Sequence, residues 1–189
     1  MWNMKRIVTI VMMALGVACG MQAQDRAEGD LNKDGINDVA EIVKPEGGRP
    51  VLNIYFGTAD GQQKLWKSYK EVIPVPEIET QMIDVSMTIT EKGVLRFEVS
   101  SFMSMGGYGN NNSNFSYRYQ NGDFFLIGKE TQSMSRNTGN LEIVSENYLT
   151  WKRQVVKDNV FAEGDVPKQE KWTRLKKRPL EKLGARVLE

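Results

Sequence analysis

Two alternating segments around an Asn-Gly dipeptide constrain the fold of this chain most strongly. Residues 114–120, NFSYRYQ, alternate aromatic and polar side chains, and residues 123–128, DFFLIG, follow directly after Asn121-Gly122. Alternation with a period of two is typical of a strand with one buried face. An Asn-Gly pair between strands favours a type I′ turn, whose positive φ angles match strand twist. The stretch therefore predicts a β-hairpin.

Similar patterns recur along most of the chain, without sustained helical periodicity. Turn sequences rich in Gly, Pro and Asn separate further predicted strands at 38–43, 50–56, 83–90, 94–100, 148–156 and 170–177. Roughly ten short strands at this spacing predict an all-β fold built as an antiparallel meander. A propeller-blade-like arrangement, a sandwich and a barrel all remain open. We expect a single β-rich domain over residues 24–178 and a C-terminal tail, 179–189, that is a short helix or loose.

The N-terminus has the pattern of an export signal. Lys5 and Arg6 precede an apolar run from Ile7 to Val17. This run is shorter than the roughly 20 residues that span a bilayer, and it fits a signal peptide over residues 1–23. We expect an exported chain, periplasmic or extracellular, with no transmembrane segment after cleavage. An alternative is a lipoprotein, since "GVAC" resembles a site at which Cys19 would be acylated.

Composition narrows the chemistry that the chain can perform. It has no histidine, and Cys19 is its only cysteine, so the usual serine and cysteine hydrolase sites and zinc sites are excluded. The chain has 25 basic and 24 acidic residues. This balance argues against a nucleic-acid partner, because such binding relies on pairing basic residues with phosphates.

Residues 29–42, GDLNKDGINDVAEI, place oxygen-bearing side chains on alternate positions before and after a glycine. Counted from Asp30, the spacing matches a calcium loop with oxygen ligands at positions 1, 3, 5 and 9, a backbone carbonyl at 7 and a carboxylate at 12. The alternative is a solvated polar turn. The predicted calcium ligands are Asp30, Asn32, Asp34, the Ile36 carbonyl, Asp38 and, as an optional sixth, Glu41.

The segment after this loop reads as strand, so the helices of an EF-hand are missing. The loop resembles the D-x-[DN]-x-D-G-x-x-D loop of FG-GAP and VCBS-type repeats, which leads into β-structure. This resemblance covers about a third of the chain after the leader, and it implies ligands at positions 1, 3, 5, 7 and 9. Glu41 at position 12 is then not required. Such repeats usually occur in tandem, whereas this chain has one clear loop.

One segment interrupts the strand pattern. Residues 101–114, SFMSMGGYGNNNSN, are rich in Gly, Asn and Ser and predict a long connection. Long loops on rigid scaffolds often carry binding function, although a mobile surface loop is the alternative. The candidate binding residues in it are Met103, Met105, Tyr108 and Asn111.

No spacing brings two carboxylates together for catalysis. We therefore expect a non-catalytic binding module of the envelope or of the secreted fraction, whose partner is an envelope protein or a glycan. A carboxylate-based glycan hydrolase is the alternative, with candidate acids Glu98, Asp123, Glu130 and Glu142. Several aromatic side chains could stack on sugars or belong to the core: Trp66, Trp151, Trp172, Tyr108, Tyr117 and Tyr119.

Overall fold

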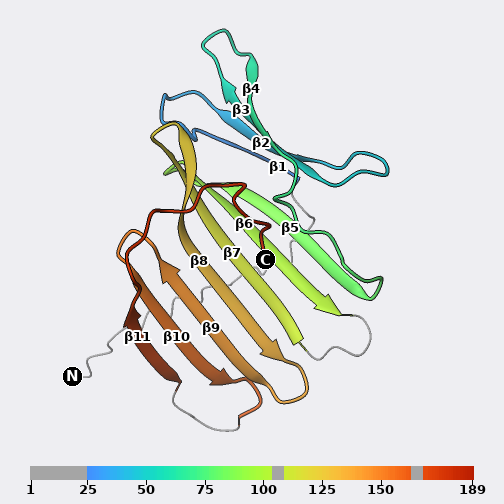
Figure 1. The fold of residues 1–189 in the computed structure, drawn as a ribbon, viewed down its shortest axis with the longest axis vertical. Helices are drawn as coiled ribbons and strands as arrows, with labels where there is room; N and C mark the ends of the chain where they lie inside the picture. Colours follow the sequence, from blue (N-terminus) through green and yellow to red (C-terminus); the bar gives the residue numbers. More distant parts are fainter. Residues whose placement is uncertain (1–24, 104–108, 163–167) are drawn as a thin grey trace, which may run out of the picture.

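The computed structural model describes residues 25–103, 109–162 and 168–189, and within these ranges the chain forms eleven strands and no helix. The strands lie in two antiparallel sheets (Figure 1). Their bounds are β1 Arg26–Gly29, β2 Asp38–Val43, β3 Val51–Gly57, β4 Gln63–Tyr69, β5 Gln81–Ile89, β6 Val94–Met103, β7 Gly109–Gln120, β8 Asp123–Ser135, β9 Asn140–Asn147, β10 Lys152–Asn159 and β11 Gln169–Arg174.

Each sheet is a meander in which sequence neighbours pair. The small sheet has the order β1-β2-β3-β4, and the large sheet has the order β11-β10-β9-β8-β7-β6-β5. Both sheets are open, with an edge strand on each side. The predicted all-β antiparallel meander is therefore confirmed, and the architecture is two open sheets.

The central hairpin forms as the Asn-Gly signal predicts. Asn121 and Gly122 have φ angles of 51° and 76°, and Gln120 pairs with Asp123 across the turn. Positive φ at both central residues is the requirement of a type I′ turn. This turn fixes the register of the two longest strands of the large sheet.

The long connection predicted at residues 101–114 is wrong for most of its length. β6 continues to Met103 and β7 begins at Gly109, so the Asn- and Ser-rich segment is strand. Asn111 pairs with Ser101 on one side and with Ser133 on the other. Pairing with two neighbouring strands outweighs the low strand propensity of Asn and Gly. Met105 and Tyr108 lie outside the described residues.

A continuous hydrophobic core joins the two sheets. It contains Leu52 and Ile54 from the small sheet and Phe97 and Phe115 from the large sheet, each at most 1% exposed. Four aromatic rings extend the contact with centroid separations of 5.1 to 5.6 Å: Phe56, Trp66, Tyr119 and Phe124. Burial of these rings supplies a large part of the driving force for packing the sheets together.

The C-terminal segment is neither helical nor loose, in contrast to the prediction for residues 180–189. β9 ends opposite Gly128, which leaves one edge of β8 unpaired before that residue. The C-terminal segment fills this edge: Leu126 N–H donates to the Glu181 carbonyl, and Leu183 N–H donates to the Phe124 carbonyl. Unpaired backbone groups at this buried edge would be costly, so the segment belongs to the fold.

Candidate functional site

The predicted calcium loop lies in the hairpin that joins β1 to β2. Gly29 pairs with Asp38 at its base, and Lys33 and Gly35 have φ angles of 67° and 87°. The carboxylate of Asp30 accepts hydrogen bonds from the N–H groups of Lys33, at 2.6 Å, and Gly35, at 3.1 Å. The side chain of position 1 therefore curls the loop around itself.

Positions 3 and 5 face each other inside the same loop. The Asn32 amide nitrogen donates to Asp34 Oδ2 at 2.9 Å, and Asp34 N–H donates to Asn32 Oδ1 at 3.0 Å. Asp34 Oδ1 also accepts the N–H of Ile36 at 2.8 Å. These bonds hold the side chains at positions 3 and 5 together within the loop.

Asp38 is the most buried member of the loop, with no exposed surface. Its Oδ2 accepts the N–H groups of Leu31, at 2.7 Å, and Asn32, at 3.2 Å, and its Oδ1 accepts Gly57 N–H at 2.9 Å. Burial raises the pKa of Asp38 despite these three bonds, and the charge of Asp34 raises it further. No basic side chain of the described residues forms an ion pair with this carboxylate.

The loop also contacts the large sheet. Lys33 Nζ donates to the Glu91 carbonyl at 2.9 Å, in the turn between β5 and β6. A Cβ at Gly93 in that turn would lie 2.6 Å from the Asp30 carbonyl oxygen. Only glycine permits this approach, so the loop is seated directly on the β5–β6 turn.

The carboxylates of the loop do not converge on a single point. Within the described ranges no group of three or more acidic, histidine or cysteine side chains is placed to hold a metal ion. Glu41, the optional sixth ligand, lies on β2 opposite Arg26 and approaches its guanidinium at 3.8 Å. The structure therefore brings Asp30, Asn32, Asp34 and Asp38 into one loop and separates Glu41 from them.

The other candidate acids and aromatic residues lie outside the loop, on strands and turns of both sheets. Asp123 is 9% exposed and lies near Lys67, at 3.7 Å, and Lys182, at 3.1 Å. Glu142 pairs with Lys157 at 2.7 Å. These two acids thus have structural partners. Among the aromatic candidates, Tyr117 is buried, Trp66, Tyr119 and Trp151 pack against the core, and Trp172 is 58% exposed.

Glu98 and Glu130 share a feature that sequence reasoning missed. The register pairs one residue from each strand of the large sheet into a continuous line, which we name the polar row: Ser86, Glu98, Asn114, Glu130, Ser145, Gln154 and Trp172. Directly paired residues project to the same face of a sheet. A sequence pattern predicts each strand separately, whereas only the register across seven strands aligns the row.

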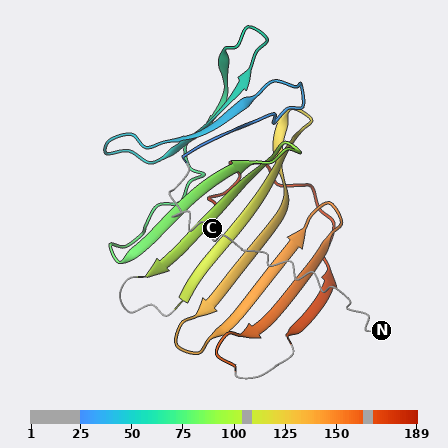
Figure 2. The ribbon, with the colours of Figure 1, turned by 180° about the vertical axis from the view of Figure 1, so that it is seen from behind.

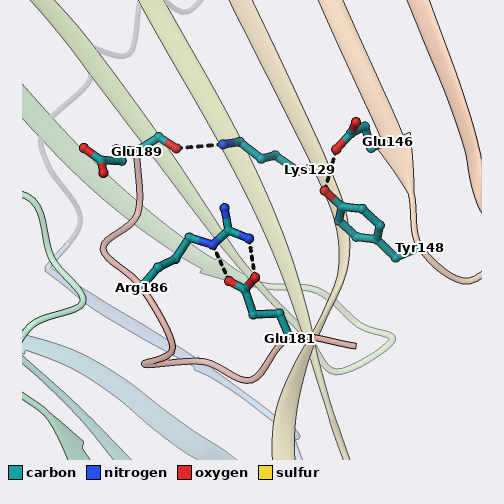
Figure 3. Close-up of polar contacts among 6 residues, drawn as sticks. All are labelled: Lys129, Glu146, Tyr148, Glu181, Arg186 and Glu189. Atoms are coloured by element: carbon teal, nitrogen blue, oxygen red, sulfur yellow. Dashed lines mark hydrogen bonds and ion pairs between the residues drawn. The ribbon is translucent and has the colours of Figure 1, made fainter. Parts of the chain in front are cut away.

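The opposite face of the large sheet carries the C-terminal segment (Figure 3). Lys129 Nζ donates to the main-chain oxygen of Glu189 at 2.7 Å, and Arg186 forms a two-point ion pair with Glu181. Burial lowers the pKa of Lys129, and the nearby charge of Arg186 lowers it further. Lys129 thus fastens the end of this segment to the sheet, and the pair of Arg186 and Glu181 holds the segment itself together.

Tyr148 and Glu146 form a neighbouring contact on this face (Figure 3). The Tyr148 hydroxyl donates to Glu146 Oε2 at 2.5 Å. Burial raises the pKa of Tyr148, and the hydrogen bond and charge of Glu146 raise it further. The phenol therefore stays neutral and acts as a hydrogen-bond donor under ordinary conditions.

Comparisons with protein-family models, with curated proteins and with solved structures find no match for this chain. In residues 25–103, 109–162 and 168–189, no helix has the length and apolar character needed to cross a membrane. Function is therefore inferred from the residues of the site.

Proposed function

We propose that this chain is an exported, non-catalytic β domain that binds one calcium ion in residues 30–38 and serves as a binding module of the envelope or the secreted fraction. The calcium assignment is supported by the arrangement of oxygen-bearing side chains in this loop. Three carboxylates and one amide lie at positions 1, 3, 5 and 9 of residues 30–38, which comprise the connection between β1 and β2 and the first residue of β2, and the buried Asp38 has no basic partner among the described residues.

The donor set fits a hard cation. Calcium takes six to eight oxygens in a flexible shell. Each carboxylate oxygen has two lone pairs, so both oxygens of Asp30 and of Asp34, which accept one N–H each, keep a second lone pair for a metal. Asp38 can offer only Oδ1, because its Oδ2 already accepts two N–H groups. The proposed ligands are the side chains of Asp30, Asn32, Asp34 and Asp38 with the Ile36 carbonyl. Binding requires the more exposed Asp30 and Asp34 to turn toward the fixed Asp38.

The proposed role of the ion is structural. Calcium would neutralise the mutual repulsion of three carboxylates and stiffen the loop that touches the β5–β6 turn through Lys33 and Gly93. The described domain contains no disulfide, because Cys19 is the only cysteine in the chain. A metal that pins the small sheet to the large sheet would supply a comparable constraint. The likeness to FG-GAP and VCBS loops supports the same ligand set.

Export is proposed from residues 1–23, which lie outside the described part of the chain. The alternative of a lipid anchor at Cys19 makes a different prediction for the processed protein. Intact mass measurement of the chain from the envelope of a Gram-negative host distinguishes the two. A cut after Gly20 or Ala23 gives an unmodified mass, whereas acylation at Cys19 adds lipid mass.

A glycan hydrolase remains the second candidate, favoured by one observation. Glu98 and Glu130 lie in the polar row with one strand between them, so their backbones are about 10 Å apart. Inverting glycosidases place their two carboxyl groups about 6.5–9.5 Å apart, and side chains that project from this backbone spacing can reach that range. However, Glu130 is exposed and Glu98 is half-buried, and catalytic sites normally exclude water around such groups. The arrangement supports binding better than hydrolysis.

Titration calorimetry with CaCl₂ tests the calcium proposal directly. We expect one site with a dissociation constant of about 10⁻⁴–10⁻³ M, typical of extracellular calcium modules. Asp30→Asn/Asp34→Asn should abolish this binding, because the two substitutions remove two negative charges. The amide oxygens that remain can still accept the hydrogen bonds of the loop. Asp60→Asn is the matched control, since Asp60 lies in another exposed turn. Absence of binding in the unaltered chain would refute the proposal.

A further inference from the structure

The polar row crosses the full width of the large sheet. Six steps between adjacent strands, at about 4.8 Å each, give it a length of roughly 29 Å. The C-terminal segment packs on the other face, where it contacts Lys129. No described strand or connection passes in front of β6 to β10 on the polar side (Figure 2). Among the described residues, the row is therefore open to a ligand along its length.

A hollow lies beside the centre of the row. The next line of paired residues contains Ser116 opposite Gly128, flanked by Arg96 and Asn147. The two small residues leave a groove of about 570 Å³ between the longer side chains. This volume falls in the range of sites for small organic ligands. Most of the residues that line the groove are polar or charged.

The chemistry of the groove favours a ligand rich in hydroxyl groups. Glu98 and Glu130 only accept hydrogen bonds, Arg96 and Lys152 only donate them, and Asn114 does both. Two acidic and two basic groups balance in charge. An anionic polymer would meet both carboxylates, and an apolar ligand would leave the polar groups unpaired. A neutral sugar chain, whose hydroxyls both donate and accept, satisfies all of them.

Part of this surface is ordered before any ligand binds. Ser145 Oγ donates to Glu130 Oε2 at 2.7 Å, and the Gln154 amide donates to Glu170 Oε1 at 2.9 Å. Side chains already held in place lose less entropy when a ligand binds. These contacts therefore favour binding by an otherwise exposed sheet face.

Trp172 provides an apolar platform at one end of the row. It lies opposite Gln154 on the edge strand β11 and is 58% exposed. Its indole N–H donates to Glu170, which fixes the orientation of the ring. A large exposed aromatic surface beside hydrogen-bonding groups suits the face of a pyranose ring, which presents C–H groups with hydroxyls at its rim.

We infer that the polar row binds a neutral glycan chain that runs across the strands and stacks one sugar on Trp172. This inference rests on the proposed non-catalytic binding function and names its ligand class. The contact surface is then the sheet face, whereas the sequence pointed to residues 101–114.

Calorimetry with cellohexaose, xylohexaose and chitohexaose tests the inference, with a heparin hexasaccharide as the anionic comparison. At least one neutral hexasaccharide should bind, and heparin should not. Trp172→Ala should weaken the binding by about tenfold or more, the loss typical of an aromatic anchor. Gly128→Thr should also weaken it by filling the hollow, since a Cβ there meets only ordinary contacts. Phe161→Ala, which removes another exposed aromatic ring, should leave affinity unchanged.

The possible results distinguish a failure of the glycan site from a failure of the proposed calcium-binding function. No binding of any neutral hexasaccharide at millimolar concentration overturns the glycan site, while calcium binding by the same preparation would leave the calcium proposal standing. Equal affinity in Trp172→Ala and the unaltered chain also overturns it. Glycan binding accompanied by cleavage, detected by chromatography of the products, would support the polar row as a glycan site and refute the non-catalytic function.

Discussion

Substitution Leu188→Ala should destabilise the domain severely, although Leu188 is the second-last residue of the chain. Its side chain has no exposed surface, and its N–H donates to the Val72 carbonyl at 2.9 Å. Truncating a fully buried leucine costs about 3–5 kcal/mol, from lost burial and from the cavity left behind. Domains of this size have stabilities of about 5–15 kcal/mol. The melting temperature should therefore fall by about 6–20 °C.

Urea unfolding followed by tryptophan fluorescence measures this loss. Leu149→Ala is the matched control, because Leu149 is 47% exposed in the turn between β9 and β10, and it should change stability by less than about 0.5 kcal/mol. A loss below about 1 kcal/mol for Leu188→Ala would show that residues 180–189 form a loose tail. The assignment of this segment to the core would then be wrong.

Two further substitutions test the contacts between the sheets. In urea unfolding, Gly93→Ala should destabilise the domain by at least about 1 kcal/mol more than Gly47→Ala. Both residues have positive φ, so both variants share the cost of placing alanine in that conformation. Only the Cβ at Gly93 meets the loop, because Gly47 faces open space. Equal losses would argue against the contact between loop and turn. Burial raises the pKa of Asp123, but Lys182, the Phe124 N–H and Lys67 lower it overall. The ionised carboxylate therefore stabilises the fold, and Asp123→Asn should be less stable than the unaltered chain. This difference in stability should be constant above about pH 5 and should shrink as the pH falls below about 4. Unfolding measured from pH 7 to pH 3 checks this, and a pH-independent difference would contradict the assigned ion pairs.

Most strands could be predicted from the sequence because turn residues and the alternation of apolar and polar side chains act over a few neighbouring residues. The Asn121-Gly122 turn and the alternation around it specify a hairpin without reference to the rest of the chain. β1 and β4 were not predicted from the alternation. All but two residues of β4 are exposed, so it lacks an apolar stripe. β1 has only four residues, too few for a periodic pattern.

Long-range pairing explains the errors. The polar segment after Gly109 is strand because β6 and β8 supply partners for its backbone. The C-terminal segment is ordered because the edge of β8 needs partners beyond the end of β9. Neither requirement can be read from the segment itself.

In the candidate site too, local features could be predicted from the sequence and long-range ones could not. Residues 30–38 could be proposed as a calcium loop from the sequence because their oxygen donors are close together along the chain. The alignment of Glu98 with Glu130 could not be predicted, since it depends on the register of β6 with β7 and of β7 with β8.

If calcium in the loop stabilises the two-sheet fold, the melting temperature measured with and without the ion should differ. Calcium at 10 mM is 10 to 100 times the expected dissociation constant, which stabilises the folded state by about 1.4–2.7 kcal/mol and for this chain gives a rise of about 3–11 °C. We expect this rise in 10 mM CaCl₂ relative to EGTA, its loss in Asp30→Asn/Asp34→Asn, and its retention in Asp60→Asn. An unaltered chain that melts at the same temperature in CaCl₂ and in EGTA would show that residues 30–38 are a polar turn without a metal.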